Sequence, residues 1–430
     1  MPTGRYQSIM RTLLSLTMAA LAALALTTPA SAATVSPTHV RFPQVAVNAH
    51  GRTVVAWERQ THGRFTVEAR IGERPAKLGR TYTLARLGYQ PRVAVGADGT
   101  VAALWAQSGP GRDVRIRVAV AAPGHGFGRA RTIEQRKNLF FPNAVTVQPG
   151  GRVVAIWPRS SGGLSYAIGL RGRRFGAARE LTAIGPVGVP SVAMDPRDGT
   201  VLVAYPTPLG LQPPVNAQAG VRTLTATAQT FSEPTVLSAT GISGEAVPTA
   251  VAGPGGSGVA FSITGDHDRS LRFARRVPDG GFAASQQIAA LVPGTFAQGV
   301  GVGLPTDGAA VAAWSVLTDP YEPMGRPLGT QPFGAVALPG SAFGAAQALG
   351  PLGRKFSDPA VAAAGGEAFV ASAVAHGPVL LAVRGPGAAT VGLPVPLAGN
   401  GDGDVQLAAG GSHVLATFQV GDRLTLQAIR

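Results

Sequence analysis

One short pattern decides the fold of this chain because it recurs along the whole sequence. Its first copy reads Phe42-Pro43-Gln44-Val45-Ala46-Val47, then a turn with Gly51, then Thr53-Val54-Val55-Ala56-Trp57. The copies occupy residues 42–57, 90–105, 141–157, 189–205, 247–261, 300–314, 358–372 and 404–418. The repeat prolines at 43, 91, 142, 190 and 248 lie 48, 51, 48 and 58 residues apart, and two copies fit in the gap of 111 before the proline at 359. Such a period is typical of an array of equal structural units.

Each unit is predicted to be a small antiparallel sheet. Its two apolar runs flank a glycine turn, which indicates a hairpin, with the proline at the first position of its strand. The runs are nearly all Val, Ala and Ile without polar alternation, so both faces should be buried. A third run alternates, as in Val114-Arg115-Ile116-Arg117-Val118, and a fourth is expected to start at an aromatic residue, over 127–133, 175–181, 231–237, 282–288 and 343–349. A sheet that is apolar inside and wetter outside is a propeller blade.

The two ends of the chain fit a closed ring. The last copy ends after its third strand at Arg430, while Thr34–Val40 precedes the first copy and is expected to supply the missing fourth strand. A ring sealed in this way leaves no open sheet edge. We therefore predict an all-β chain with a single β-propeller over residues 33–430 and eight four-stranded blades. Seven blades with a divergent insertion is the alternative, because the sixth copy lacks the proline.

The composition is that of an ordered chain without covalent cross-links. Hydrophobic residues make up 45% of the 430 residues and charged residues 14%, which argues against disorder. There is no cysteine, which excludes a disulfide scaffold, a cysteine zinc site and a thiol enzyme.

Residues 1–32 are predicted to be a secretory signal peptide. Arg5 and Arg11 precede an apolar stretch over 13–26, and Ala30-Ser31-Ala32 fits a small-x-small cleavage motif. The stretch is shorter than the ~20 apolar residues of a membrane span, and no second stretch reaches that length. We therefore expect a secreted, extracellular propeller without a membrane span.

The repeat resembles that of secreted bacterial β-propellers of the sialidase-like or WD-repeat-like kind. The resemblance covers residues 42–430. The stretch from Ala97 to Trp105 lacks the hydroxyl and the Gly–Trp distance of a sialidase Asp-box, and Trp57 and Trp105 precede Glu58 and Ala106 instead of the Asp of WD repeats. The resemblance therefore implies the architecture and not the activity of either family.

Four tryptophans share one position of the repeat: Trp57, Trp105, Trp157 and Trp314. A ring of aromatics that stack on sugars is one interpretation. The favoured interpretation is packing between blades, since the position ends a buried strand.

The charge is concentrated in the first half of the predicted ring. Residues 33–200 hold 24 Lys+Arg and 9 Asp+Glu, a net charge of +15, whereas residues 201–430 hold 11 and 13, a net charge of −2. The loops between second and third strands share one rim with the loops between blades. On this rim we predict a ligand-binding surface made of Arg59, Arg86, Tyr89, Arg112, Arg136, Lys137, Phe140 and Arg159. Arginine forks suit carboxylate, sulfate and phosphate groups, and a one-sided field concentrates anions. The other interpretation is a solvated face that keeps the protein soluble.

Two acidic segments were weighed as metal sites. Asn400, Asp402 and Asp404 have the spacing of a calcium loop, but Val405 and Gly411 replace its usual Gly and Glu. Asp266-His267-Asp268 alternate in direction along the chain. We expect turns at both places, with no metal and no cofactor.

A catalytic site is not predicted. The segment Val316–Pro332 breaks the repeat as a long loop, and a sialidase-type hydrolase would need a tyrosine with a carboxylate partner there. Tyr321 and Glu322 are adjacent, so they point apart in an extended chain.

The sequence thus predicts a monomeric, non-catalytic binding or scaffold module. Its partner would be an anionic polysaccharide or other anionic polymer of the cell surface, or a protein; no nucleic acid is expected, since no such motif is present. Two alternatives remain open: a glycan-cleaving, sialidase-like hydrolase, and a purely structural protein of the envelope.

Overall fold

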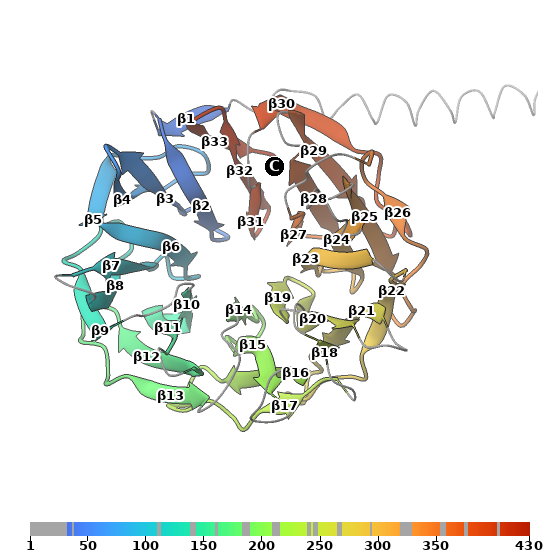
Figure 1. The fold of residues 1–430 in the computed structure, drawn as a ribbon, viewed down its shortest axis with the longest axis horizontal. Coiled ribbons are helices and arrows are strands. Elements are labelled where there is room, and N and C mark those ends of the chain that lie inside the picture. Colours follow the sequence, from blue (N-terminus) through green and yellow to red (C-terminus); the bar gives the residue numbers. More distant parts are fainter. Residues whose placement is uncertain are drawn as a thin grey trace, which may run out of the picture.

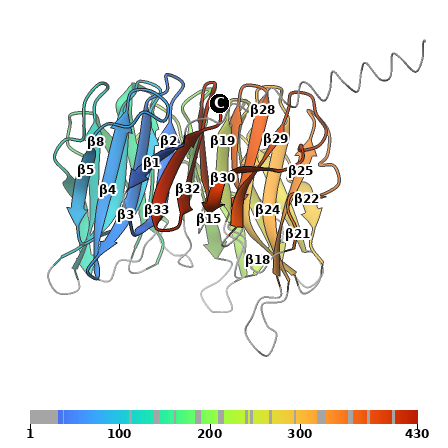
Figure 2. The same cartoon turned by 90° about the horizontal axis from the view of Figure 1, so that it is seen from above.

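The chain forms an eight-bladed β-propeller (Figure 1). The computed structural model describes residues 32–36, 38–109, 113–137, 143–159, 162–182, 190–208, 216–238, 242–243, 248–264, 269–292, 295–318, 329–352, 358–373, 377–401 and 405–430. Its antiparallel sheets surround one axis, and their strands run from one rim of the ring to the other (Figure 2). The prediction of eight blades is confirmed, and the alternative of seven is wrong, because the irregular sixth copy forms a complete blade.

Blades 1 to 4 follow one another along the chain. Their strands are β2 (Val40–Val47), β3 (Thr53–Thr61), β4 (Arg64–Gly72), β5 (Thr81–Arg86), β6 (Gly88–Val95), β7 (Val101–Ser108), β8 (Asp113–Ala121), β9 (Arg131–Lys137), β10 (Ala144–Gln148), β11 (Arg152–Pro158), β12 (Leu164–Leu170), β13 (Arg179–Thr182), β14 (Ser191–Met194), β15 (Val201–Pro208), β16 (Asn216–Leu224) and β17 (Thr235–Val236). A short strand, β18 (Ile242–Ser243), also pairs with β16, and a single 3-10 turn, Pro149–Gly151, joins β10 to β11.

Blades 5 to 8 repeat this order. Their strands are β19 (Thr249–Gly253), β20 (Gly256–Thr264), β21 (Arg269–Arg275), β22 (Gln286–Ala290), β23 (Thr295–Gly303), β24 (Ala310–Thr318), β25 (Gly329–Ala337), β26 (Gln347–Ala348), β27 (Ala360–Ala364), β28 (Glu367–Ala373), β29 (Gly377–Arg384), β30 (Val395–Gly401), β31 (Gln406–Gly410), β32 (His413–Val420) and β33 (Arg423–Ala428).

The ring is closed by the N-terminal strand, as predicted. Strand β1 (Ala33–Ser36) pairs with β33, so the last blade has the order β1-β33-β32-β31. First strands of successive blades contact one another around the ring, and β31 contacts β2 again. Closure removes the open edge that a linear array of sheets would present.

The hydrophobic core lies between neighbouring blades. Trp57, Trp105, Trp157 and Trp314 are at most 1% exposed. Trp105 of blade 2, for example, packs with Val67 and Ala85 of blade 1. Because each tryptophan fills the space toward the preceding blade, the packing interpretation of this repeat position is confirmed.

The fourth strands begin later than predicted. Phe127, Phe175, Phe282 and Phe343 each form a single bridge to the third strand. Regular pairing starts four residues farther on, at Arg131, Arg179, Gln286 and Gln347. The residue after the bridge, a glycine in three of these blades and Ala283 in blade 5, donates its N–H to the third strand, as Gly128 does to the carbonyl of Val120. The chain therefore turns at this point before it enters the outer strand.

The sixth blade corrects the expected long loop at 316–332. Val316–Thr318 belongs to β24 and Gly329–Pro332 to β25, and these two ends pair with each other. Asp319, Tyr321, Glu322 and Met324 lie outside the described residues. In the part of the chain that is described, no helix is long and apolar enough to cross a membrane.

The ring has two different rims, the turn rim and the loop rim. The turn rim carries the connections from first to second and from third to fourth strands. The loop rim carries the connections from second to third strands and from one blade to the next. Up-and-down connectivity requires this division.

Candidate functional site

The inner strands of blades 1 and 2 are bulged at the loop rim. In β2 the residues Phe42 and Pro43 both lie opposite Trp57, and in β6 Gln90 and Pro91 both lie opposite Trp105. The extra residue of a bulge has no partner in the ladder, so the missing N–H of proline does no harm there. The repeat prolines of these two blades therefore lie inside their strands, and those at 190, 248 and 359 lie one residue before theirs, whereas the prediction placed each proline at the first position of its strand.

Both bulges place a bulky residue in left-handed backbone. The φ angle is 49° at Phe42 and 47° at Gln90, and it is 55° at the equivalent Gly299 of blade 6. Glycine adopts such angles without strain, but side chains with a Cβ rarely do. Strained backbone that the surroundings hold in place is often found at binding sites.

Glu58 holds the second bulge. Its side chain is 2% exposed, and its Oε1 atom accepts a hydrogen bond from the backbone N–H of Gln90 in the next blade. Burial raises the pKa of Glu58, while the Gln90 N–H and the charges of Arg41 and Arg92 act in the opposite direction. The carboxyl group therefore joins blade 1 to blade 2, and the charges of an arginine from each of these blades act on it.

Aromatic rings adjoin these charges. The rings of Phe65 and Tyr89 lie 5.5 Å apart at their centres. The guanidinium of Arg41 lies 5.4 Å from the ring centre of Phe42 and 5.8 Å from that of Phe65. Arg41 and Phe42 are exposed, and Phe65 and Tyr89 are half-buried. We define the loop-rim cluster as Arg41, Phe42, Glu58, Phe65, Arg86, Tyr89 and Arg92.

The predicted residues of blades 1 and 2 lie in or beside this cluster. Tyr89 is part of it, and Arg86 ends the neighbouring strand β5 with an exposed side chain. Arg59 lies near the end of β3 and forms an ion pair with Glu68 at 3.4 Å. That carboxylate also accepts a hydrogen bond from Trp57 Nε1 at 3.1 Å.

The remaining predicted residues are spread along the rim. Arg136 forms an ion pair with Glu134 at 2.6 Å, and Arg159 of blade 3 forms one with Glu180. Lys137 ends β9, and its side chain, like Arg112 and Phe140, lies outside the described residues. Arg136 and Arg159 are thus neutralised by carboxylates, so their share in a binding surface stays a prediction.

Sequence reasoning missed Arg41, Phe42, Glu58, Phe65 and Arg92. A signal was present for Arg92, because it follows the repeat proline, where other copies have Gln44, Ser191, Thr249 and Ala360. Only the ring brings the charges of Arg41 and Arg92 to act on Glu58, since the two arginines come from different blades.

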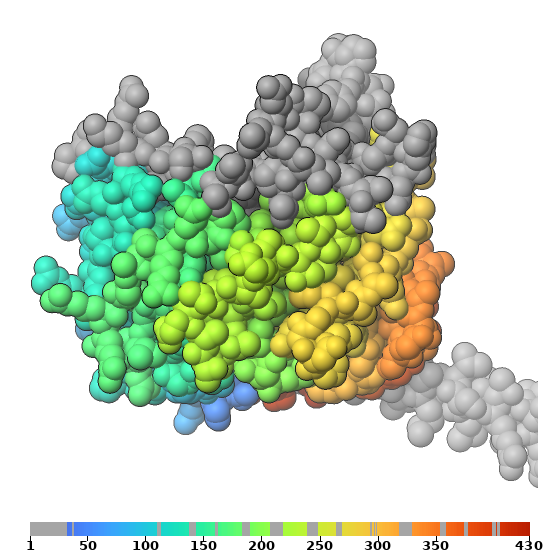
Figure 3. Space-filling view, turned by 90° about the horizontal axis from the view of Figure 1, so that it is seen from below, coloured from blue at the N-terminus to red at the C-terminus, as the bar shows by residue number. Residues whose placement is uncertain are grey.

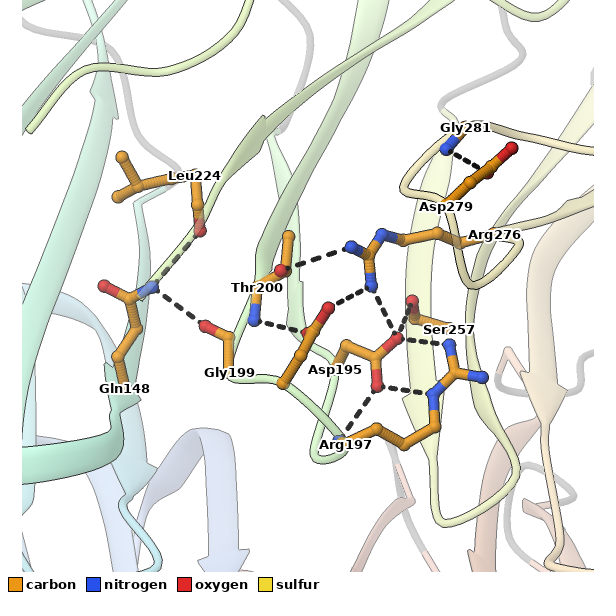
Figure 4. Close-up of polar contacts among 11 residues, drawn as sticks. Gln148, Asp195, Arg197, Gly199, Thr200, Leu224, Ser257, Arg276, Asp279 and Gly281 are labelled. Atoms are coloured by element: carbon orange, nitrogen blue, oxygen red, sulfur yellow. Dashed lines mark hydrogen bonds and ion pairs between the residues drawn. The ribbon is translucent and has the colours of Figure 1, made fainter. Parts of the chain in front are cut away.

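At the turn rim, buried side chains join neighbouring blades. Asp195 of blade 4 is fully buried and accepts hydrogen bonds from Arg197 Nε at 2.9 Å and Ser257 Oγ at 2.7 Å (Figure 4). Arg276 of blade 5 donates to Asp195 and to Asp198, at 3.1 and 2.8 Å. These hydrogen bonds and ion pairs join blade 5 to blade 4.

Side-chain hydrogen bonds also join other neighbouring blades at the turn rim. Gln148 of blade 3 donates to the carbonyls of Gly199 and Leu224 in blade 4 (Figure 4). Arg52 of blade 1 donates to the carbonyls of Ala122 and His125 in blade 2, at 2.9 and 2.7 Å. These side chains of the turn rim are therefore bound by neighbouring blades, whereas the loop rim carries the exposed Arg41 and Phe42 beside the rings of Phe65 and Tyr89.

Metal and catalytic candidates gain no support. Among the residues that the structure describes, no three His, Asp or Glu side chains are grouped so that they could hold a metal ion. Asp266-His267-Asp268, Asp402, Asp404 and the side chain of Asn400 lie outside those residues.

Comparison with known proteins yields a shared fold. No family model matches the chain, and no curated protein is similar in sequence. Among solved structures, a lectin from Burkholderia pseudomallei has a TM-score of 0.52 at 14% identity, over 84% of this chain and 100% of the lectin. A polysaccharide lyase has a TM-score of 0.50 at 10% identity, over 77% of this chain and 88% of the lyase. These similarities show that the chain has a β-propeller architecture found in solved proteins.

Proposed function

We propose that this chain is an exported, non-catalytic binding module that holds an anionic polysaccharide of the cell surface at the loop-rim cluster. The observation that carries the proposal is the contact of Arg41 with the rings of Phe42 and Phe65, beside the ring of Tyr89 from the next blade. Guanidinium forks bind carboxylate and sulfate groups, and aromatic faces pack against the apolar faces of sugar rings.

The location within the ring supports an anionic ligand. The cluster lies in the half of the sequence that carries a net charge of +15, and the other half carries −2. A field of one sign raises the local concentration of oppositely charged polymers and their rate of association. Solved propellers of this fold include a lectin and a polysaccharide lyase, so a carbohydrate ligand is compatible with the architecture.

A binding experiment tests the proposal. The variant Arg41→Gln/Arg86→Gln removes two positive charges from the cluster. The matched control Arg74→Gln/Lys77→Gln removes two from exposed positions at the turn rim of the same blade. Binding to immobilised polygalacturonate, dextran sulfate and neutral dextran is measured by surface plasmon resonance at several salt concentrations.

We expect the cluster variant to bind the charged polymers about tenfold more weakly, a loss of roughly 1.4 kcal/mol, while the control stays within about twofold. Equal loss in both variants would reduce the effect to net charge, and no binding by the natural protein would favour the structural envelope protein. Release of new reducing ends from the bound polymer would favour the glycan-cleaving alternative, and loss of that release in Tyr321→Phe would assign it to the 316–332 segment.

Export is a separate part of the proposal. It predicts cleavage after Ala32, so that the secreted protein begins at Ala33, the first residue of β1. Intact-mass measurement of protein from the culture medium checks this, and a mature protein that retains residues 1–32 would overturn it.

A further inference from the structure

A groove lies on the outer side of the ring between blades 2 and 3. It has a volume of about 830 Å³. Blade 2 contributes Val118 and Val120 of β8 and the segment 128–133, and blade 3 contributes Leu170 and the segment 172–177 between β12 and β13. Figure 3 views the ring from the side of β13 and β17, and its colours follow chain order around this outer surface. Val118, Val120 and Leu170 lie toward the turn-rim ends of β8 and β12, whereas the loop-rim cluster lies at the opposite rim.

Four arginines and no acidic residue line this groove. They are Arg129 and Arg131 of blade 2 and Arg173 and Arg174 of blade 3, and all are exposed. Within the described part of the chain, none of the four forms an ion pair. Arg131 Nη1 donates to the backbone carbonyl of Arg173 at 2.7 Å, so this arginine spans the two blades.

The carboxylates of the neighbouring segments have other partners. The Oδ2 atom of Asp98 lies 3.6 Å from Nη1 of Arg171, and the Oε1 atom of Glu134 lies 2.6 Å from Nε of Arg136. Glu180 forms its ion pair with Arg159. The positive charge of the groove is therefore not offset by acidic groups within it.

Arg117, whose side chain bonds to the lining residue Ala130, is repelled by neighbouring arginines. The pKa of Arg117 is lowered by burial and, next, by repulsion from Arg115 and Arg129. Its Nη2 atom donates to the carbonyl of Ala130 at 3.0 Å, beside the lining. A bound anion would relieve this repulsion, which favours occupancy by a negatively charged ligand.

Part of the lining of the groove is apolar. Val118 is 1% exposed, and Ile133 and Phe175 are half-buried. Leu170, at one side, is 43% exposed. Ligand sites of this size commonly combine an apolar lining with a few convergent polar groups. A sugar ring offers the matching surface, because its C–H faces are apolar and its substituents at the edge are polar.

We propose that this groove is a second binding site, which takes a short oligosaccharide bearing carboxylate or sulfate groups. The sugar faces lie on the apolar part of the lining formed by Val118, Ile133 and Phe175. The anionic groups are bound by the guanidinium forks of Arg129, Arg131 and Arg174. This site is independent of the loop-rim cluster, since it uses other residues on another part of the ring.

The test uses the full chain with two matched double variants. Arg129→Gln/Arg174→Gln removes two exposed charges from the groove. Arg74→Gln/Lys77→Gln removes two from the corresponding connection of blade 1. The probes are fluorescein-labelled tetramers of polygalacturonate and of a sulfated glucan, with a neutral glucan tetramer as control, and binding is read by fluorescence anisotropy. Thermal unfolding verifies that each variant is folded.

We expect the groove variant to bind the charged tetramers about tenfold more weakly, while the blade 1 control changes by less than about twofold. In the natural protein, the tetramer should slow amide exchange over 129–133 and 170–177. The variant Arg41→Gln/Arg86→Gln should retain this protection even if it loses polymer binding, so the two proposals fail separately. Unchanged affinity in the groove variant, or protection elsewhere only, would overturn the groove site. Tighter, Arg129-dependent binding of a single-stranded DNA oligonucleotide or of phosphatidylglycerol vesicles would overturn its assignment to saccharides.

Discussion

Arg276 and Asp195 join two blades: the Nη1 atom of Arg276 in blade 5 lies 3.1 Å from the Oδ2 atom of Asp195 in blade 4. Both side chains are buried, at 6% and 0% exposure. A buried ion pair is tolerated when further hydrogen bonds satisfy its atoms, and here Arg197 and Ser257 supply them.

Removal of this carboxylate should destabilise the ring. Asp195→Ala leaves Arg276 buried with only Asp198 as an acidic partner, and breaking such a buried pair costs about 3–5 kcal/mol. Asp198→Ala is the control and should cost less, because Asp198 is 46% exposed and its loss leaves Arg276 paired with Asp195. Urea unfolding measures both, and equal losses would contradict the prediction.

The same residue predicts how stability depends on pH. Burial alone would raise the pKa of Asp195, but hydrogen bonds from Arg197 and Ser257 hold it well below its ordinary value of 3.8. A carboxyl whose folded pKa is depressed stabilises the fold above its unfolded pKa, and this stability is lost as the pH falls below about 4. Asp195→Asn should therefore be less stable than the natural protein at pH 7 and should lose less on acidification. Melting curves from pH 2 to 7 check this; parallel curves would refute it.

Two buried tryptophans should respond differently to loss of the indole N–H. Trp57 Nε1 donates to Glu68 at 3.1 Å, whereas Trp105 Nε1 is buried and has no hydrogen-bond partner among the described residues. Hydrogen bonds to charged groups contribute about 1.5–3 kcal/mol. Trp57→Phe should therefore cost more stability than Trp105→Phe by about that amount, as measured by urea unfolding. A larger loss at Trp105 would contradict this account.

The raised pKa of Glu58 predicts that its contribution to the stability of the fold decreases as the pH rises. Burial raises its pKa above 4.5 despite the Gln90 N–H and the charges of Arg41 and Arg92. A carboxyl with a raised folded pKa favours the folded state most below its unfolded pKa, and this advantage is lost as the pH rises through the folded value. Glu58→Gln keeps an acceptor for the Gln90 N–H and carries no charge. Its melting temperature should therefore rise relative to that of the natural protein between about pH 4 and 7.

The control for this experiment is Glu58→Ala, which removes the acceptor and should be destabilised throughout that range. The melting temperatures of the natural protein and of both variants are measured across this pH range. A constant difference between Glu58→Gln and the natural protein would show that the Glu58 carboxyl does not titrate differently in the folded state.

Strand β1 should be needed for a closed, non-associating ring. Deletion of residues 33–36 removes Val35, which is 2% exposed and packs in the cluster that contains Trp57 and Leu424. It also leaves the outer edge of β33 unpaired, and such edges recruit other chains. We expect a lower melting temperature and concentration-dependent association, measured by light scattering. A monodisperse variant with unchanged melting would contradict the role of β1.

The repeat by itself was sufficient to predict the architecture. Two short apolar runs around a glycine turn must bury both faces, and a set of such hairpins can do so only by packing against one another in a ring. Closure by the N-terminal strand and the packing role of Trp57, Trp105, Trp157 and Trp314 follow from local pattern and period. The period favoured eight blades but left seven open, and the sheet formed by the irregular sixth copy decided between them.

The two proposed binding surfaces depend on the tertiary structure. Arg41 and Arg92 are 51 residues apart in sequence, yet both act on Glu58, because a bulge in each inner strand and the curvature of the ring bring two blades together. Likewise, Arg131 reaches the backbone of Arg173 across a blade boundary. A period in the sequence specifies which positions are equivalent, but the contacts between side chains of different blades depend on bulges, rotamers and neighbours that no single repeat contains.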